Sequence, residues 1–342
     1  MHGSVNTTYA ESAEPDEPGG NSYAARFVAS VIVSTEASAS ILGNALVLFV
    51  SLSDIQVRHH RASLLVVSLA LTDLLTAFLV MIPSIFALSD PLSRPLGYPP
   101  FCTFHAILNY WLTTTSSITL AMIALDRGLA IRRPLEYVQR STMSRICRMV
   151  ALPWTLGIVF ALVPALLHWT DYQFDNIVCD VDWHPRHEHR LFYAALFTIC
   201  FAIPAAIIVV QYARIMLSVQ RLHATTPAPI GLPQRCKAKD SDSTSSQSSQ
   251  NSDGHQKIFL SILAVIAIFF VCITPFCCTK LVKVLYGPKA IPDWLDMLST
   301  VVQFLASVVN PFVYSIGLRS FREALCRLIR TGRHRLLLFY ST

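Results

Sequence analysis

Charged side chains are scarce in this sequence. Asp, Glu, Lys and Arg make up 14% of the 342 residues, whereas 53% are hydrophobic and the mean hydropathy is +0.48. A soluble domain of this length carries far more charge on its surface. The composition therefore disfavours a large soluble helical bundle and predicts a membrane protein.

The sequence patterns of two large enzyme classes are also missing. Neither HExxH nor GxSxG, which mark zinc proteases and serine hydrolases, occurs in the chain. We therefore expect no enzyme activity and no catalytic residues.

Long apolar runs recur along the chain. A hydrocarbon core about 30 Å thick needs about 20 apolar residues per helix, and lipid accepts only helices and closed barrels. The ten-residue alternation that is typical of a barrel is missing. We therefore predict an all-α membrane protein, a seven-transmembrane helix bundle, with spans at residues 25–52, 62–88, 101–125, 146–169, 191–217, 257–285 and 294–317.

The basic residues indicate how these spans are oriented. With the N-terminus outside, 20 of the 27 Lys and Arg residues fall on the cytoplasmic side, as the positive-inside rule requires. The positive charge thus lines one face of the bilayer. No nucleic-acid partner is expected, despite the net charge of +6.

One motif in each apolar run follows the next in a fixed order. In chain order they are Asn44 in GNALV, Asp73 in LALTDLL, Cys102 with Asp126 and Arg127, Trp154 in LPWTLG, Pro204 in AIPAA with Tyr212, Pro275 in CITPF, and Asn310 to Tyr314 as NPFVY. This series resembles a rhodopsin-like (class A) G protein-coupled receptor, and the resemblance covers residues 25 to 330.

The resemblance implies a receptor of the plasma membrane with an extracellular N-terminus and a cytoplasmic C-terminus. It would bind an unknown extracellular ligand and couple to a heterotrimeric G protein, with receptor kinases and arrestin as further partners. Arg127 would be held by Asp126 in the inactive state and released when helix six moves outward. The same switch would use Tyr212, Pro275, Asn310, Pro311 and Tyr314.

The division of the chain follows from this resemblance. Residues 1–24 would be an extracellular tail, with a glycosylation sequon at Asn6. Residues 25–317 would form the seven-transmembrane receptor domain. Cys102 and Cys179 are both expected on the oxidising side of the membrane, and we predict that they form a disulfide bond.

An ion site is implied as well. Asp73, Ser116, Ser307 and Asn310 resemble the sodium pocket of the family, in which oxygen ligands suit a hard cation. No other cofactor is expected. Retinal is excluded because Phe304 stands where opsins carry the lysine that binds it.

The outer ends of the helices contain the residues that we expect to bind a ligand. They are His105, Asn109, Thr113, Phe276, Lys280 and Gln303. Asn109 stands where amine receptors carry an aspartate, so a protonated amine would lack its counter-ion. Lys280 and Lys283 would either attract an anionic ligand or pair with Asp293 and Asp296.

Three positions depart from the family pattern. Gly128 replaces the usual tyrosine of DRY, although glycine in a helix costs about 1 kcal/mol relative to alanine. His255 falls where many relatives carry an acid that restrains Arg127, and Ile273 replaces a tryptophan switch. These departures predict a weakly restrained receptor with signalling in the absence of agonist.

Two cytoplasmic segments are expected to be regulatory. Residues 222–256 contain many Ser, Gln and Asp residues and predict a disordered third intracellular loop, with candidate phosphorylation sites at residues 241–252. Residues 318–342 would form an amphipathic helix and a short tail, with Phe321, Leu325 and Leu328 on one face. Cys326 is a candidate palmitoylation site.

Two alternatives stay open on the sequence alone. A transporter or channel would fit seven spans, but transporters show internal repeats and several intramembrane charges. This chain has no evident repeat, and Asp73 is the one acid that we place deep in an apolar run. A ligand-independent, receptor-like modulator is the second alternative.

Overall fold

The structure is a computed structural model, and it describes the chain in segments. These are residues 20–55, 61, 63–89, 99–167, 170, 171, 177, 178, 180, 181, 187–225, 268, 269, 271–317 and 321–330. Asn6, Cys179, His255 and residues 226–256 lie outside the described residues, as does the side chain of Tyr314. The predictions made for these residues therefore stay predictions.

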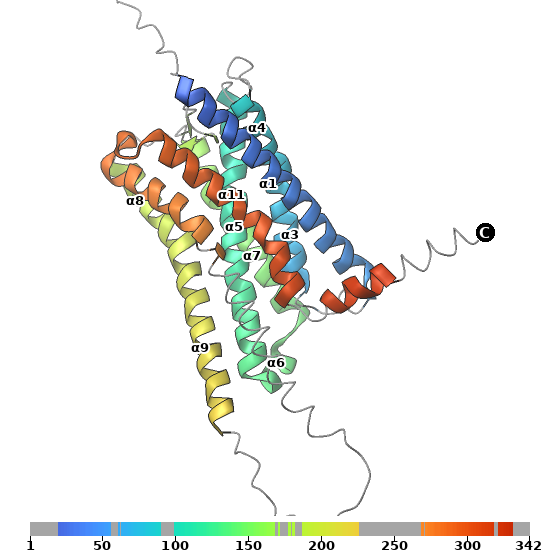
Figure 1. Cartoon of the computed structure of the whole chain (residues 1–342). Coiled ribbons are helices and arrows are strands. Elements are labelled where there is room, and N and C mark those ends of the chain that lie inside the picture. Colours follow the sequence, from blue (N-terminus) through green and yellow to red (C-terminus); the bar gives the residue numbers. More distant parts are fainter. Residues whose placement is uncertain are drawn as a thin grey trace, which may run out of the picture.

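Long helices that run roughly side by side build the molecule (Figure 1). Two of the predicted spans each consist of two α-helices joined by one π-helical turn. In chain order the elements are α1 Gly20–Ser53; α3 Ser63–Thr76, η1 Ala77–Met81 and α4 Ile82–Ser89; α5 Pro99–Arg132; α7 Met143–Leu166; α8 His187–Phe197, η2 Thr198–Ala202 and α9 Ile203–Thr225; a helix over residues 271–286; and α11 Asp293–Gly317.

The observed helices coincide with the predicted spans, with shifts at their ends. Within the described residues, five spans are long and apolar enough to cross a bilayer. α5 is long enough but more polar, and the predicted span 257–285 is described only from residue 268 onward. α1 begins inside the predicted tail 1–24, and α9 ends at Thr225, inside the predicted loop 222–256.

Several short elements connect the long ones. α6 Pro134–Arg140 follows α5, and η3 Pro288–Ala290 precedes α11. The strands β1 Thr170–Asp171 and β2 Asp180–Val181 pair antiparallel, which the all-α prediction did not include. Gly287 has a φ of 97°, and its N–H donates to the carbonyl of Lys283 at 2.8 Å. Only glycine adopts this backbone conformation without strain, so it ends the helix over residues 271–286.

The two π-helical turns have a common cause. η1 ends two residues before Pro83, and η2 ends two residues before Pro204. Proline has no N–H, and its ring clashes with the carbonyl of the preceding turn, so the helix widens to a π-turn there. Pro204 therefore produces a π-turn in the fifth span, and Pro83 has the same effect in the second span.

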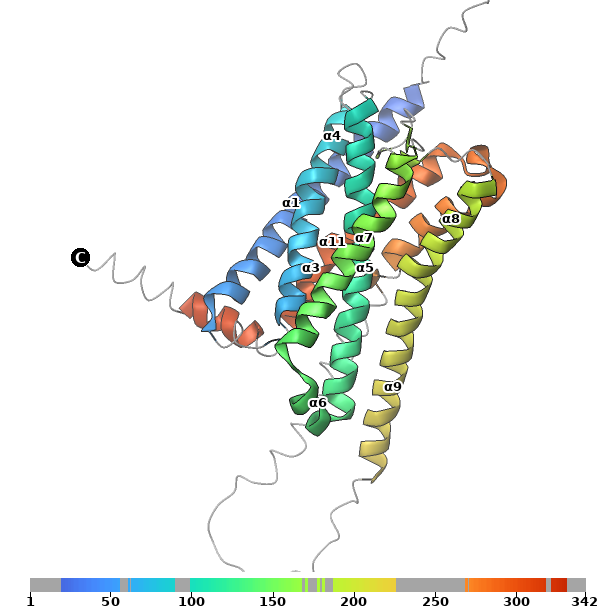
Figure 2. The same cartoon turned by 180° about the vertical axis from the view of Figure 1, so that it is seen from behind.

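α5 lies in the middle of the bundle and contacts α3, α7 and α9. Seen from behind, α7 crosses in front of α5 (Figure 2). A Cβ atom on Gly157 of α7 would lie 2.8 Å from the carbonyl oxygen of Trp111, so glycine permits this close approach. The Trp111 indole donates to the carbonyl of Trp154 at 3.1 Å, and the Trp154 indole donates to Ser68 at 2.9 Å.

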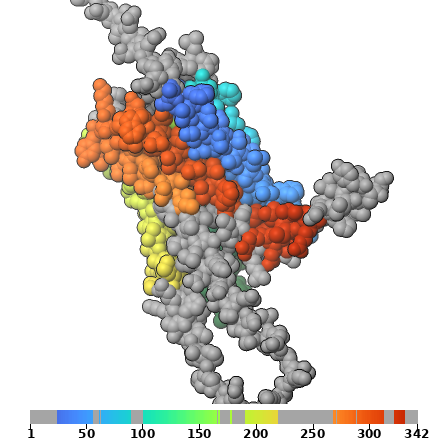
Figure 3. Space-filling view, in the orientation of Figure 1, coloured from blue at the N-terminus to red at the C-terminus, as the bar shows by residue number. Residues whose placement is uncertain are grey.

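The helix over residues 321–330 lies against the C-terminal end of α1 (Figure 3). It buries Phe321 and Ala324, with Leu325 and Leu328 packed partly against the same core. The face predicted from the sequence is thus the face that packs. The Arg327 guanidinium donates twice to one carboxylate oxygen of Asp54, at 2.9 and 3.0 Å.

Candidate functional site

The first candidate site lies near the C-terminal end of α5. This helix continues to Arg132, so Asp126 and Arg127 lie within it and not at its edge. Asp126 is fully buried, whereas 22% of the Arg127 side chain is exposed. The guanidinium Nη2 lies 3.6 Å from carboxylate Oδ2. We call this pair the latch.

Tyr137 of α6 also contacts the latch. Its hydroxyl donates to Oδ2 of Asp126 at 3.2 Å, the same oxygen that Arg127 approaches. Burial, followed by the neighbouring Asp126 carboxylate, raises the pKa of the Tyr137 phenol, so the hydroxyl keeps its proton and donates. Oδ1 of Asp126 has no hydrogen-bond partner among the described residues.

Gly128 lies in contact with Gln211 of α9. Oε1 of Gln211 accepts a hydrogen bond from Nη2 of Arg132 at 2.9 Å, and Nε of Arg132 donates to the carbonyl of Gly128 at 3.0 Å. Gln211 is buried, and a side chain at position 128 would occupy its place. The glycine thus leaves room for Gln211, whose hydrogen bond with Arg132 joins α5 to α9.

The other predicted switch residues lie along the core of the bundle. Tyr212 of α9 is buried in a hydrophobic cluster to which α1, α3, α5 and α11 also contribute. Pro275 is half-buried in the helix over residues 271–286. Pro311 lies against α1, where its Cγ would be 2.9 Å from a Cβ atom on Gly43.

A polar cluster occupies the middle of the bundle. Nδ2 of Asn310 donates to Oδ2 of Asp73 at 2.7 Å, and Nδ2 of Asn44 donates to the carbonyl of Ser307 at 3.1 Å. Ser116 and Ser307 line a small adjacent cavity. The four predicted ion ligands thus lie together or line that cavity.

Oxygen atoms in this cluster are available to a cation. Oδ1 of Asp73, Oδ1 of Asn44 and Oδ1 of Asn310 are buried and have no hydrogen-bond partner among the described residues. One carboxylate with amide and hydroxyl oxygens is the donor set that a hard cation prefers. The residues present therefore fit a sodium ion.

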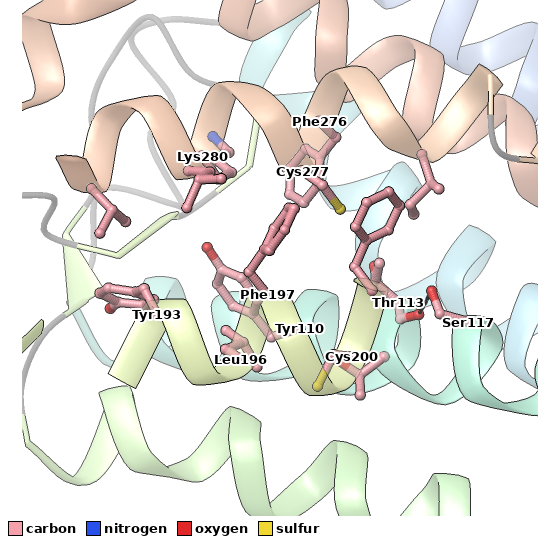
Figure 4. A pocket seen from close by; sticks show the side chains of 15 residues that line it. Tyr110, Thr113, Ser117, Tyr193, Leu196, Phe197, Cys200, Phe276, Cys277 and Lys280 are labelled. Carbon is pink, nitrogen blue, oxygen red and sulfur yellow. Dashed lines mark hydrogen bonds between the residues drawn. The ribbon is translucent and has the colours of Figure 1, made fainter. Parts of the chain in front are cut away.

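A second candidate site is an open pocket on the side of the latch toward the N-terminal end of α5, and we call it the outer pocket (Figure 4). Its empty space, counted together with the open solvent at its mouth, is about 610 Å³. α5, the α8–η2 segment and the helix over residues 271–286 form its walls. The lining is mostly aromatic and aliphatic, and it includes Tyr110, Thr113, Ser117, Tyr193, Phe197, Cys200, Phe201, Ile273, Phe276, Cys277 and Lys280.

Three of the predicted ligand residues, Thr113, Phe276 and Lys280, line this pocket. Nε2 of Gln303 donates to the hydroxyl of Thr113 at 2.8 Å from the neighbouring cavity. His105 and Asn109 are buried outside the pocket lining, and the His105 ring lies 3.2 Å from the carbonyl of Val80 in η1.

The two lysines of the outer pocket region share one carboxylate. Nζ of Lys280 lies 3.0 and 3.1 Å from the two oxygens of Asp296, and Nζ of Lys283 lies 2.7 Å from one of them. The Thr279 and Ser299 hydroxyls are hydrogen bonded at 3.1 Å beside this group. Of the two alternatives that the sequence left open, pairing is thus observed for Asp296, whereas Asp293 is exposed.

Some polar groups were missed by sequence reasoning. Glu36 is buried within α1, so the statement that Asp73 is the one deep acid is wrong. The signal was present in the run VSTEASAS. Arg26, near the N-terminal end of α1, is also buried and donates to the carbonyl of Ala87 at 2.8 Å.

Cys102 at the start of α5 is buried and disulfide-bonded. Its predicted partner lies outside the described residues. Cys326 is an exposed free cysteine on the helix over residues 321–330, which is compatible with its predicted modification.

Together, the bundle, the latch and the outer pocket define a seven-helix membrane receptor. The sequence model of the family described as "7 transmembrane receptor (rhodopsin family)" matches residues 43–314, and the chain belongs to this family. Membership confirms the class A resemblance and a multi-pass membrane protein that is a receptor and not an enzyme. It also decides against the transporter alternative.

Several curated receptors are similar to the chain. G protein-coupled receptor 161 of Bos taurus is 26% identical over 323 residues, which are 90% of this chain and 59% of that protein. The D(1B) dopamine receptor of Mus musculus is 26% identical over 292 residues, 77% of this chain and 60% of that protein. Trace amine-associated receptor 3 of Mus musculus is 30% identical over 210 residues, 60% of each chain. The chain thus spans about three fifths of the length of these relatives.

Proposed function

We propose that this protein transmits an extracellular signal to a heterotrimeric G protein across the plasma membrane. The observation that carries the proposal is the latch, a buried Asp126 with a partly exposed Arg127 at the cytoplasmic end of the central helix. The outer pocket lies along residues 110–117 of the same helix, toward its opposite end. The N-terminus would be extracellular and the C-terminus cytoplasmic.

Activation would couple these two ends. A ligand in the outer pocket contacts Phe276, one residue after Pro275, and proline leaves this helix without one backbone hydrogen bond. The cytoplasmic half of the helix would then swing outward around Pro275. Arg127 would leave Asp126 and face the G protein, with Tyr212 and Tyr314 turning inward to hold the open state.

The latch is weakly restrained in the form described here. A 3.6 Å separation is longer than a hydrogen bond between charged groups, and Tyr137 shares the same oxygen. A weak restraint leaves the active state populated without agonist. We therefore propose appreciable basal signalling, with a ligand-independent modulator as the alternative.

A sodium ion would act on the same equilibrium. Asp73, Ser116, Ser307 and Asn310 would hold it, and its charge would compensate the buried Asp73 carboxylate in the inactive state. Receptor kinases and arrestin would be further partners through phosphorylation of residues 241–252, and palmitoylation of Cys326 would attach the last helix to the bilayer.

An amine ligand is a second candidate, because the names of two relatives refer to dopamine and trace amines. A protonated amine needs a carboxylate partner in a pocket shielded from water. Among the described residues that line the outer pocket, none is acidic. We therefore favour a ligand that is not an amine.

Second-messenger output without ligand tests the proposed function. The intact chain, Arg127→Ala and the control Arg133→Ala would be compared for cAMP and inositol phosphate at equal surface expression. The Arg133 side chain is 62% exposed and forms an ion pair only with Glu136 among the described residues, so its loss should leave signalling unchanged. A basal signal lost in Arg127→Ala alone supports coupling. A basal signal that survives Arg127→Ala contradicts it.

A further inference from the structure

The outer pocket has one charged group among the described residues that line it. This is Lys280, whose ammonium nitrogen lies 5.2 Å from the centroid of the Phe276 ring. Figure 4 shows Lys280 at one end of the cavity, with Thr113 and Ser117 toward the other. The pocket therefore has a cationic end and an apolar body.

The partner of Lys280 is doubly paired. Asp296 is contacted by Lys280 at 3.0 and 3.1 Å and by Lys283 at 2.7 Å. Lys283 is buried and lies outside the pocket lining. If Lys280 turns toward a ligand, Lys283 keeps the Asp296 carboxylate paired. A buried carboxylate without any partner would strongly oppose such a movement.

The body of the pocket favours a flat apolar molecule. Tyr110, Tyr193, Phe197, Phe201 and Phe276 supply five aromatic rings to its walls. Lys280 and Ile273 both line it and are seven residues apart on one helix, which corresponds to about 10 Å along the helix axis. Aromatic walls of this extent suit a ligand with stacked or edge-on rings.

We propose that the outer pocket binds an aromatic molecule with a single anionic group, which docks on Lys280 while Lys283 holds Asp296. The inference rests on the proposed function, because it takes this pocket as the agonist site. Lys280 is the residue that selects the charge of the ligand. Because Lys283 continues to pair with Asp296, Lys280 is able to turn toward the ligand.

Direct binding to the purified full chain in lipid nanodiscs tests this inference. The probes are biphenyl-4-carboxylate, the neutral biphenyl-4-methanol and the cationic biphenyl-4-methylamine, which share one apolar body. A hydrogen bond to a charged group should make the carboxylate bind about tenfold or more tightly than the alcohol. The amine should bind more weakly than both, because its charge faces Lys280.

Variants of two lysines complete the test. Lys280→Gln should remove the carboxylate preference and keep the affinity for the alcohol, which also shows that the pocket is still folded. Lys280→Arg should retain the preference. Lys289→Gln is the matched control, because Lys289 is exposed in η3, and it should bind all three probes as the parent chain does.

Two results would overturn the inference: equal affinity for carboxylate and amine, or an unchanged carboxylate affinity in Lys280→Gln. The binding assay contains no G protein, so its outcome is independent of coupling. The parent chain could prefer the carboxylate in the binding assay while Arg127→Ala leaves its basal signal unchanged. This pair of results would contradict the proposed function but would support the ligand class inferred here for the outer pocket.

Discussion

A Cβ atom added to Gly128 would lie 2.5 Å from Oε1 of Gln211, closer than two such atoms can approach. Gln211 cannot easily move aside, because Arg132 donates to the same oxygen at 2.9 Å. Glycine costs about 1 kcal/mol in a helix relative to alanine. Here that cost is offset by the contact between α5 and α9 that only glycine allows.

The effect of Gly128→Ala on the stability of the protein should therefore be of opposite sign with and without the Gln211 side chain. Gly128→Ala alone should lower the thermal unfolding temperature, because the new methyl group displaces Gln211 from Arg132. In a Gln211→Ala background the clash is gone, and Gly128→Ala should instead stabilise by about 1 kcal/mol through helix propensity. Thermal unfolding of the parent chain, the two single variants and the double variant measures this coupling. Equal effects of Gly128→Ala in both backgrounds would refute it.

Removal of the carboxylate that the two buried lysines share should be far more damaging than loss of an exposed one. Asp296→Asn would leave Lys280 and Lys283 without this partner, and breaking a buried ion pair from one side costs about 3 to 5 kcal/mol. Asp293→Asn, three residues away and exposed, should change stability by less than about 0.5 kcal/mol. The unfolding temperatures of the two variants provide the comparison, and similar values would show that the buried group is not a stabilising one.

Close packing of α1 on α11 gives a third prediction. A methyl group on Gly43 would lie 2.9 Å from Cγ of Pro311, and the proline ring cannot rotate away. Gly43→Ala should thus destabilise by about 1 to 3 kcal/mol, as overpacking does. Ser38→Ala on the exposed side of α1 is the control, with little expected change. Unfolding temperatures of both variants test this, and an unaffected Gly43→Ala would mean that the two helices can separate at little cost.

The helices could be predicted because span length and apolar content are local properties of the chain. The bilayer fixes both, so every predicted span coincides with a helix wherever the structure describes it. The order of the motifs also predicted the latch and the neighbourhood of Asp73 and Asn310. The π-turn at Pro83 was missed, because proline in a helix permits either a kink or a widened turn.

What could not be predicted depends on contacts between distant segments. The sequence alone presents Gly128 as a departure that weakens the latch. Its structural role depends on Gln211, which is more than 80 residues away in the chain and lies beside it in the structure. The choice of Asp296 over Asp293 depends on which side of α11 faces the lysines. Glu36 was missed because one acid barely changes the hydropathy of a long run.

The Tyr137 hydroxyl should weaken the latch, because it occupies the carboxylate oxygen that Arg127 approaches. Tyr137→Phe removes a hydrogen bond of 3.2 Å to Oδ2 of Asp126 and leaves Arg127 as the remaining partner described for this carboxylate. One hydrogen bond contributes about 1 kcal/mol, so the basal second-messenger signal should fall about fivefold. Val138→Ala, on an exposed side chain of the same short helix, should leave the signal unchanged. If Tyr137→Phe instead raises the basal signal at equal surface expression, Tyr137 stabilises the inactive carboxylate and does not compete with Arg127.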